Sequence, residues 1–185
     1  MGKCRRLVAH RLMQALAIAS LLVATWLTSA SQVAAAKSVK LAVFNFELND
    51  TSLSGAQLGV NSKEQQRLIK ISDLLRAQLA KSGDYVVADL APAQAEIEDA
   101  GFISSCNGCD ADIAKKLGAQ LAITGVVNKV SNLILSINLN VRGADTGELL
   151  GVWTADIRGN TDESWSHGVK WLVRNRMLKA LATYE

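Results

Sequence analysis

The sequence predicts an α/β fold with α+β character: one domain on a mixed sheet of about five strands, with helices packed on the sheet. Two observations support this prediction. In the first half of the chain, short apolar runs alternate with stretches whose apolar residues recur at three- and four-residue steps, as in strand–helix units. From Gln120 onward, apolar residues recur at every second position until a last amphipathic helix, as in antiparallel strands. The expected element order is β-α-β-α-α-β-β-β-α.

The amino terminus has the layout of a secretory signal peptide, which we expect to occupy residues 1–36. A basic segment precedes the apolar run Leu12–Leu27, and small residues follow, with Ala34 and Ala36 placed for cleavage. The run is shorter than the ~20 residues of a membrane-spanning helix, which disfavours the alternative of an uncleaved anchor. Cleavage would release a single domain, residues 37–185, into the periplasm or the medium.

The net charge of the chain depends on this leader. The whole sequence has 20 Lys and Arg against 17 Asp and Glu, for a net charge of +3. Four of the basic residues and none of the acidic ones lie in residues 1–36, so the mature chain has a net charge of about −1. No basic stripe remains that would indicate nucleic-acid binding, and no other segment is apolar enough to span a membrane.

The first predicted unit is a strand, a helix and a strand, the order of a parallel, right-handed βαβ unit. Ser38–Leu48 is a nearly continuous apolar run, typical of a strand covered on both faces. The polar stretch Asn49–Ser62 is expected to be a loop. Residues 63–83 have the apolar period of a helix that Ser62 would cap, and residues 84–90 form the second strand.

The remaining predicted elements are two short helices, three strands and a last helix. Asp110 would cap the second short helix. In the later strands one face is apolar, with Leu133 to Val141 alternating in one strand and Leu149 to Ile157 in the next. The elements are, in order, helices 92–101 and 110–118, strands 120–130, 133–143 and 149–159, and helix 160–185.

Two cysteines, Cys106 and Cys109, lie in a C-x-x-C spacing between the two short helices. In an oxidising compartment, two close thiols usually form a disulfide, which here would brace the start of the second helix. A redox centre is one alternative, although the C-x-x-C of thioredoxin-like sites follows a strand and not a helix. A metal site is another, and it would need His167 with Asp110 or Asp112 to reach four ligands.

The long loop provides the candidates for binding a ligand or a partner. It leaves the carboxyl end of the first strand, where open α/β sheets tend to bind ligands. A mobile surface loop is the alternative. Trp171 lies off the apolar stripe of the last helix and is the candidate for contact with a partner protein. His167 has no partner motif, so we expect no catalytic residue, metal or cofactor. The loop candidates are Asn49, Asp50, Thr51 and Ser52.

The stretch from Cys106 to Gly151, "CNGCDADIAKKLGAQLAITGVVNKVSNLILSINLNVRGADTGELLG", resembles the TolB-type amino-terminal domain and curli-secretion-lipoprotein-like domains. With the opening "VKLAVFNFELNDTSLSG", it resembles still more an uncharacterised family of predicted secreted bacterial proteins, a domain of unknown function. The resemblance implies a periplasmic α/β sandwich with a binding or assembly role and no catalytic residues. Unlike the named domains, this chain has no following β-propeller and no lipobox cysteine.

These observations favour a non-enzymatic periplasmic module that binds another periplasmic protein or a small ligand, through the Asn49–Ser62 loop or an exposed sheet edge. A thiol-disulfide factor that uses Cys106 and Cys109 is the first alternative. The second, which the resemblance suggests, is an accessory protein of a periplasmic oxidation system of the quinoprotein type.

Overall fold

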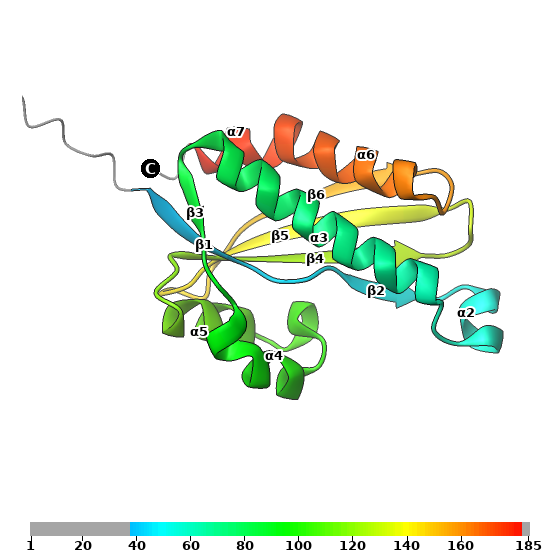
Figure 1. Cartoon of the computed structure of the whole chain (residues 1–185), viewed down its shortest axis with the longest axis horizontal. Coiled ribbons are helices and arrows are strands. Elements are labelled where there is room, and N and C mark those ends of the chain that lie inside the picture. The colour runs from blue at the N-terminus through cyan, green and yellow to red at the C-terminus, as the bar shows by residue number, and fades with distance from the viewer. Residues whose placement is uncertain (1–37, 183–185) are drawn as a thin grey trace, which may run out of the picture. The chain divides into compact units, whose positions relative to one another are not determined.

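One sheet has the spatial strand order β3-β1-β4-β5-β6, with β2 beside β4 as a sixth strand (Figure 1). The computed structural model describes residues 38–182, so the predicted leader and its cleavage lie outside the described residues. The strand and helix order confirms the predicted α/β fold with a mixed sheet. The strands are β1 (Val39–Val43), β2 (Glu47–Asp50), β3 (Tyr85–Val87), β4 (Leu121–Lys129), β5 (Leu135–Gly143) and β6 (Leu149–Ile157).

Helices cover the sheet on both faces. Figure 1 shows α3, α6 and α7 on one face and α4 and α5 on the other, with α2 beyond the end of β2. Across residues 38–182, no helix combines the length and the apolar character that a bilayer crossing requires. The helices are α2 (Leu53–Leu58), α3 (Ser62–Ser82), α4 (Gln94–Ala100), α5 (Cys109–Lys116), α6 (Asp162–Leu172) and α7 (Leu178–Leu181), with short turns η1 (Ala91–Ala93), η2 (Ile103–Ser105) and η3 (Val173–Met177).

Two apolar clusters fill the space between these layers. The larger one joins the sheet to α3 and α6, with Leu75 and Trp165 among its fully buried side chains. The smaller one joins the sheet to α4 and α5, with Phe44 and Ile113 buried in it. Because β1 contributes to both clusters, its residues are apolar almost without interruption, as the sequence pattern requires of a strand covered on both faces.

The parallel strand pairs lie in the first part of the chain. β1 and β3, joined through α3, are parallel with Val39 opposite Tyr85, which confirms the predicted parallel pairing. β4 is parallel to β1 and antiparallel to β5, and β5 is antiparallel to β6. β4 thus joins the parallel part of the sheet to the antiparallel part, and β5 and β6, which pair only in antiparallel, have alternating burial patterns.

The prediction of a single strand over Ser38–Leu48 is wrong in one respect, because the structure has two strands there, β1 and β2. Both strands pair in parallel with β4. Three residues separate β1 from β2, whereas only two residues of β4, Thr124 and Gly125, separate the segments that pair with them. The extra residue turns Phe46 so that its ring lies against Gly125, where a Cβ atom would collide with it. The backbone N–H of Phe46 then donates to Ser72 Oγ at 2.8 Å.

The predicted loop Asn49–Ser62 contains regular structure. It begins with the last two residues of β2, and α2 then occupies Leu53–Leu58. Ser52 caps this helix, since its Oγ accepts from the N–H of Gly55 at 3.1 Å. The serine is a strong cap, but six residues without a buried side chain carry no apolar period that would predict a helix.

Both predicted helix caps are wrong by one position or more. Ser62 is the first residue of α3, and Asn61 caps the helix instead. The second short helix begins at Cys109, so Asp110 lies within its first turn. There the carboxylate of Asp110 is buried and accepts from Arg142 Nε at 3.2 Å, a partner distant in sequence.

The antiparallel strands follow the predicted alternation except at their ends. The register shifts between Val141 and Arg142, where Leu150 is an extra residue in β6. Leu150 is therefore partly buried, and Leu149, which the alternation places inside, is 47% exposed. Leu133 is also exposed, because it lies in the turn before β5. The predicted last helix is interrupted by the wider π turn Val173–Met177 between α6 and α7.

Candidate functional site

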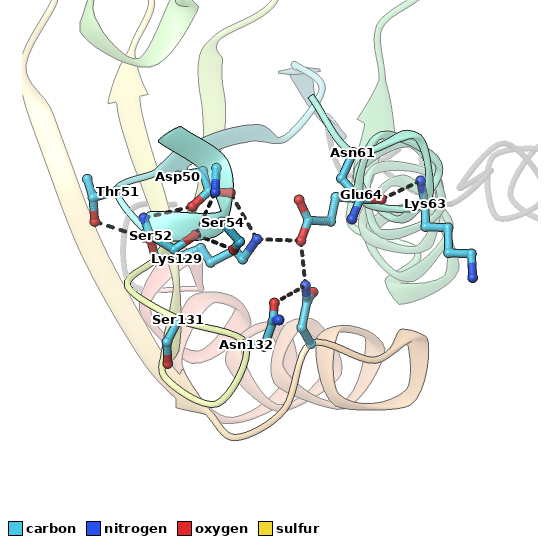
Figure 2. A network of polar contacts seen from close by, with 12 residues as sticks. Asp50, Thr51, Ser52, Ser54, Asn61, Lys63, Glu64, Lys129, Ser131 and Asn132 are labelled. Atoms are coloured by element: carbon cyan, nitrogen blue, oxygen red, sulfur yellow. Dashed lines mark hydrogen bonds and ion pairs between the residues drawn. The ribbon is translucent and has the colours of Figure 1, made fainter. Parts of the chain in front are cut away.

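The four predicted loop residues lie where β2 ends beside β4, but their side chains contact the chain itself. Figure 2 shows three of them, Asp50, Thr51 and Ser52. Asn49 Nδ2 donates to Asn128 Oδ1 at 2.9 Å. Thr51 Oγ1 donates to a backbone carbonyl of β4 at 3.2 Å, and Ser52 is buried as the cap of α2. These side chains therefore fasten α2 to the sheet, and much of their hydrogen-bonding capacity is already used.

Lys129 is the centre of a buried polar cluster that joins β2, β4 and α3. Its Nζ lies 2.9 Å from Asp50 Oδ2 and 2.7 Å from Glu64 Oε1, and Figure 2 shows it between the two carboxylates. Lys129 is 3% exposed and Glu64 is 1% exposed. A buried ammonium next to two carboxylates is charge-compensated, which is the condition for burying such groups.

The two ion pairs shift the pKa of Lys129 and the pKa of Asp50 toward the charged form. Burial by itself disfavours the charged form of Lys129, but its hydrogen bonds to Glu64 and Asp50 outweigh burial and raise its pKa. Burial also opposes ionisation of Asp50, but hydrogen bonds from Ser52 and Lys129 outweigh burial and lower its pKa. Both groups are therefore held in their charged forms, and neither is suited to exchange a proton near neutral pH.

The cluster extends to the loop before α6. Glu64 Oε1 also accepts from Asn160 Nδ2, and Arg67 Nη1 donates to Asn160 Oδ1 at 3.1 Å. The N–H of Asn160 donates to the carbonyl of Asn132 at 2.9 Å, in the turn between β4 and β5. Four separate segments thus meet at one end of the sheet, and the arrangement is that of a structural clamp.

The sequence contains a signal from which this buried cluster could have been predicted. Lys129 occupies a position that the alternation of β4 assigns to the buried face, two residues after Val127. Glu64 lies four residues before Leu68, on the apolar stripe of α3. A lysine and a glutamate at positions that two periods assign to the core indicate a buried ion pair.

The two cysteines form the predicted disulfide. Cys106 and Cys109 have Cα atoms 5.7 Å apart, and Cys109 is the first residue of α5. Nearby, the carboxylate of Glu47 accepts from the N–H groups of Ile103 and Ser104 at 2.6 and 3.0 Å. The short segment before the disulfide is thus anchored to β2, which fits a bracing role for the bridge.

His167 does not approach the cysteines. It lies on α6, and α6 and α5 cover opposite faces of the sheet (Figure 1). Within residues 38–182, no three His, Cys, Asp or Glu side chains are grouped so as to hold a metal ion. The ligand set that the metal alternative requires is therefore not assembled.

Trp171 lines a pocket at the outer edge of the sheet. The pocket has a volume of about 320 Å³ and lies between Thr154–Ile157 of β6 and three residues of α6, namely His167, Gly168 and Trp171. Trp171 is 38% exposed, and the guanidinium of Arg176 lies 5.5 Å from the centre of its ring. A second pocket of about 630 Å³ shares Asp156 and Ile157 with the first and continues toward the turn before β5.

The outer side of β6 from Val152 to Asp156 is not covered by another described strand. β6 pairs with β5, and no described strand pairs with its other side. In an antiparallel pair, alternate residues direct their N–H and C=O groups toward the neighbouring strand and away from it. The N–H of Gly143 donates to the carbonyl of Glu148, so the odd-numbered residues of β5 direct their backbone groups toward β6. Beyond the register shift, the partners of these residues in β6 are also odd-numbered, from Gly151 to Ile157, and direct their backbone groups toward β5. The backbone groups of Val152, Thr154 and Asp156 therefore point outward.

The chain is similar to one protein family and, at low sequence identity, to several solved structures. A family model described as "DUF3280: Protein of unknown function (DUF2380)" matches residues 39–177. No curated protein matches the chain. Among solved structures, the LpoB C-terminal domain from Salmonella enterica is similar at 17% identity and a TM-score of 0.44, over 72% of this chain and 91% of that chain. TolB from Acinetobacter baumannii is similar at 12% identity and a TM-score of 0.47, over 78% of this chain and 28% of that chain.

Proposed function

The chain belongs to this DUF3280 family of unknown function, as the resemblance in its sequence implied, and we propose that it is a non-enzymatic module that binds another protein after export. The proposed binding surface is the outer edge of β6 together with the pocket beneath Trp171, which we call the β6 edge. The partner would add an extended segment to the edge as a further strand, a common mode of peptide recognition.

The observation that carries this proposal is the difference between the two edges of the sheet. The opposite edge consists of two short strands, β3 with three residues and β2 with four, and short edge strands protect a sheet from unwanted pairing. The β6 edge is nine residues long, and Val152 in its middle is 52% exposed. A long edge that no other described strand covers, beside a pocket, is suited to a partner strand.

The state of the charged groups supports a non-enzymatic role. Among the described residues, the groups whose pKa clearly departs from the ordinary value are Asp50, Lys129 and Asp162. Hydrogen bonds from Arg67 and Lys70 lower the pKa of Asp162, so all three groups are held in ion pairs. Shifted groups in active sites are instead poised to exchange protons or attack a substrate.

Site-specific crosslinking in cells tests the proposal. A photoreactive residue in place of Thr154, whose backbone points outward, should crosslink the chain to another protein. A photoreactive residue in place of Val86 on the β3 edge is the matched control, because Val86 is 47% exposed and also belongs to an edge strand. The Trp171→Ala substitution should reduce the Thr154 crosslink without lowering the amount of folded protein. Equal crosslinking from both edges, or none from Thr154, would contradict the proposal.

A further inference from the structure

A basic surface that we call the basic rim borders the β6 edge, with one residue just after β6 and three on the helical segment: Arg158, Lys170, Arg174 and Arg176. All four side chains are exposed, and none forms an ion pair with another described residue. From residue 170 to residue 181 the chain has four basic residues and no acidic one. The expected mature chain is slightly acidic, so positive charge is concentrated on this side.

The favourable effect of cations at the carboxyl end of a helix does not account for the basic residues of the rim. Cations stabilise the last turn of a helix through the carbonyl groups there, but the effect falls off within that turn. The helical segment runs from Asp162 to Leu181, and Lys170 and Arg174 lie more than one turn before its end. Arg158 lies before the helix altogether, among the residues that line the larger pocket.

The geometry of the pocket connects the basic rim to a strand on β6. A partner strand beside β6 would direct alternate side chains toward α6, where Ala155, Ile157 and Trp171 line an apolar pocket. The guanidinium of Arg176 lies against the ring of Trp171, so a positive charge borders the pocket. A side chain two residues from the pocket, on the same face of the partner strand, would meet the basic rim.

From this juxtaposition we propose that the partner of the β6 edge is an extended, acidic protein segment, in which an apolar residue fills the pocket and carboxylates meet the basic rim. The inference rests on the proposed function and adds the chemistry of the partner to it. Two acidic residues lie on this side, Asp156, which lines both pockets, and Glu163, which lies near Arg158; neither forms an ion pair with the basic rim, whose four cations outnumber them. Opposite charges at the edge of an interface set the orientation and the rate of association.

The crosslink from Thr154 provides the test, with the crosslinked segment of the partner identified by mass spectrometry. A synthetic peptide of that segment is then titrated with the chain, and binding is followed by fluorescence anisotropy at low and high salt. The test variant is Lys170→Glu with Arg174→Glu. The control, Lys63→Glu with Lys81→Glu, makes the same change in charge at two exposed lysines of α3.

We expect a segment with a surplus of Asp and Glu, whose binding weakens with salt and falls at least about tenfold in the test variant but not in the control. A neutral or basic segment, a second copy of this chain, or equal binding by both variants would overturn the inference and leave the proposed function standing. The same holds if the basic rim binds vesicles of anionic lipid and the peptide does not compete. The proposed function itself would be defeated by the absence of any protein crosslinked from Thr154, or by equal crosslinking from the two edges.

Discussion

Lys129 is the residue on which the end of the sheet depends. Its ammonium compensates two carboxylates, those of Asp50 and Glu64, and Glu64 is almost fully buried. In Lys129→Met these carboxylates lose their counter-charge, and removing one partner of a buried ion pair costs about 3–5 kcal/mol of unfolding free energy. Chemical denaturation at neutral pH measures the loss. Lys115→Met is the control, because its ion pair with Asp145 is exposed and should contribute at most about 1 kcal/mol.

The pH dependence of stability provides a second test at the residue scale. The pKa of Asp50 is lowered in the folded chain, so this carboxylate contributes stability above the unfolded-state pKa, which is near 3.8. That contribution is lost as the pH falls through the folded-state pKa. We therefore expect Asp50→Asn to destabilise the protein at pH 7 and to have little effect near pH 2, as measured by urea denaturation at both values. An effect that persists undiminished in acid would contradict the ion-pair assignment.

At the scale of an element, α2 depends on its cap more than on packing. None of its side chains is buried, and Leu53 and Leu58 are more than 80% exposed. Ser52→Ala removes the hydrogen bond to the N–H of Gly55 and should destabilise the helix by about 1 kcal/mol. Hydrogen exchange should become faster at Gly55–Gly59, with the amides of α3 unchanged. Equal acceleration in α3 would mean that α2 and α3 unfold together.

The disulfide at the start of α5 allows the redox alternative to be tested. Cys106 and Cys109 close a very short loop, for which the chain-entropy estimate gives at most about 2 kcal/mol, the low end of the usual range. If the bridge only braces α5, its reduction potential should lie below about −300 mV, as in structural disulfides. Equilibration with glutathione and thioredoxin buffers, followed by thiol titration, measures the potential. A value close to those of disulfide exchange proteins would favour the thiol-disulfide factor.

At the scale of the whole molecule, the sequence predicts the architecture because burial acts on many residues at once. The alternation in β5, from Leu135 to Val141, corresponds to a strand with one buried face, and the stripe of α3 to a helix on the sheet. Features set by single long-range contacts were not predictable. The break between β1 and β2 depends on Phe46 meeting Gly125, and the orientation of Asp110 depends on Arg142. Local patterns do not contain these pairings.

The candidate site likewise contains residues that could be predicted from local patterns and residues that could not. Trp171 could be selected from the sequence, because its position off the apolar stripe is a property of one helix. The β6 edge could not, since only the complete strand order shows that β6 ends the sheet while β4 and β5 lie inside it. The roles of Asn49 and Ser52 in holding α2 against the sheet could not be predicted either, because they require the pairing of β2 with β4.

The predicted signal peptide leads to a last prediction, about the form of the chain in the cell. If residues 1–36 are a signal peptide, the mature protein begins at Lys37 and its mass lacks the leader. Bulky residues at the cleavage position should block processing, so the variant Ala34→Leu with Ala36→Leu should retain the leader. Intact mass spectrometry of protein from the periplasmic fraction distinguishes the two forms. A wild-type chain that keeps residues 1–36 would show that the leader is an anchor, and the β6 edge would then have to meet its partner at the membrane surface.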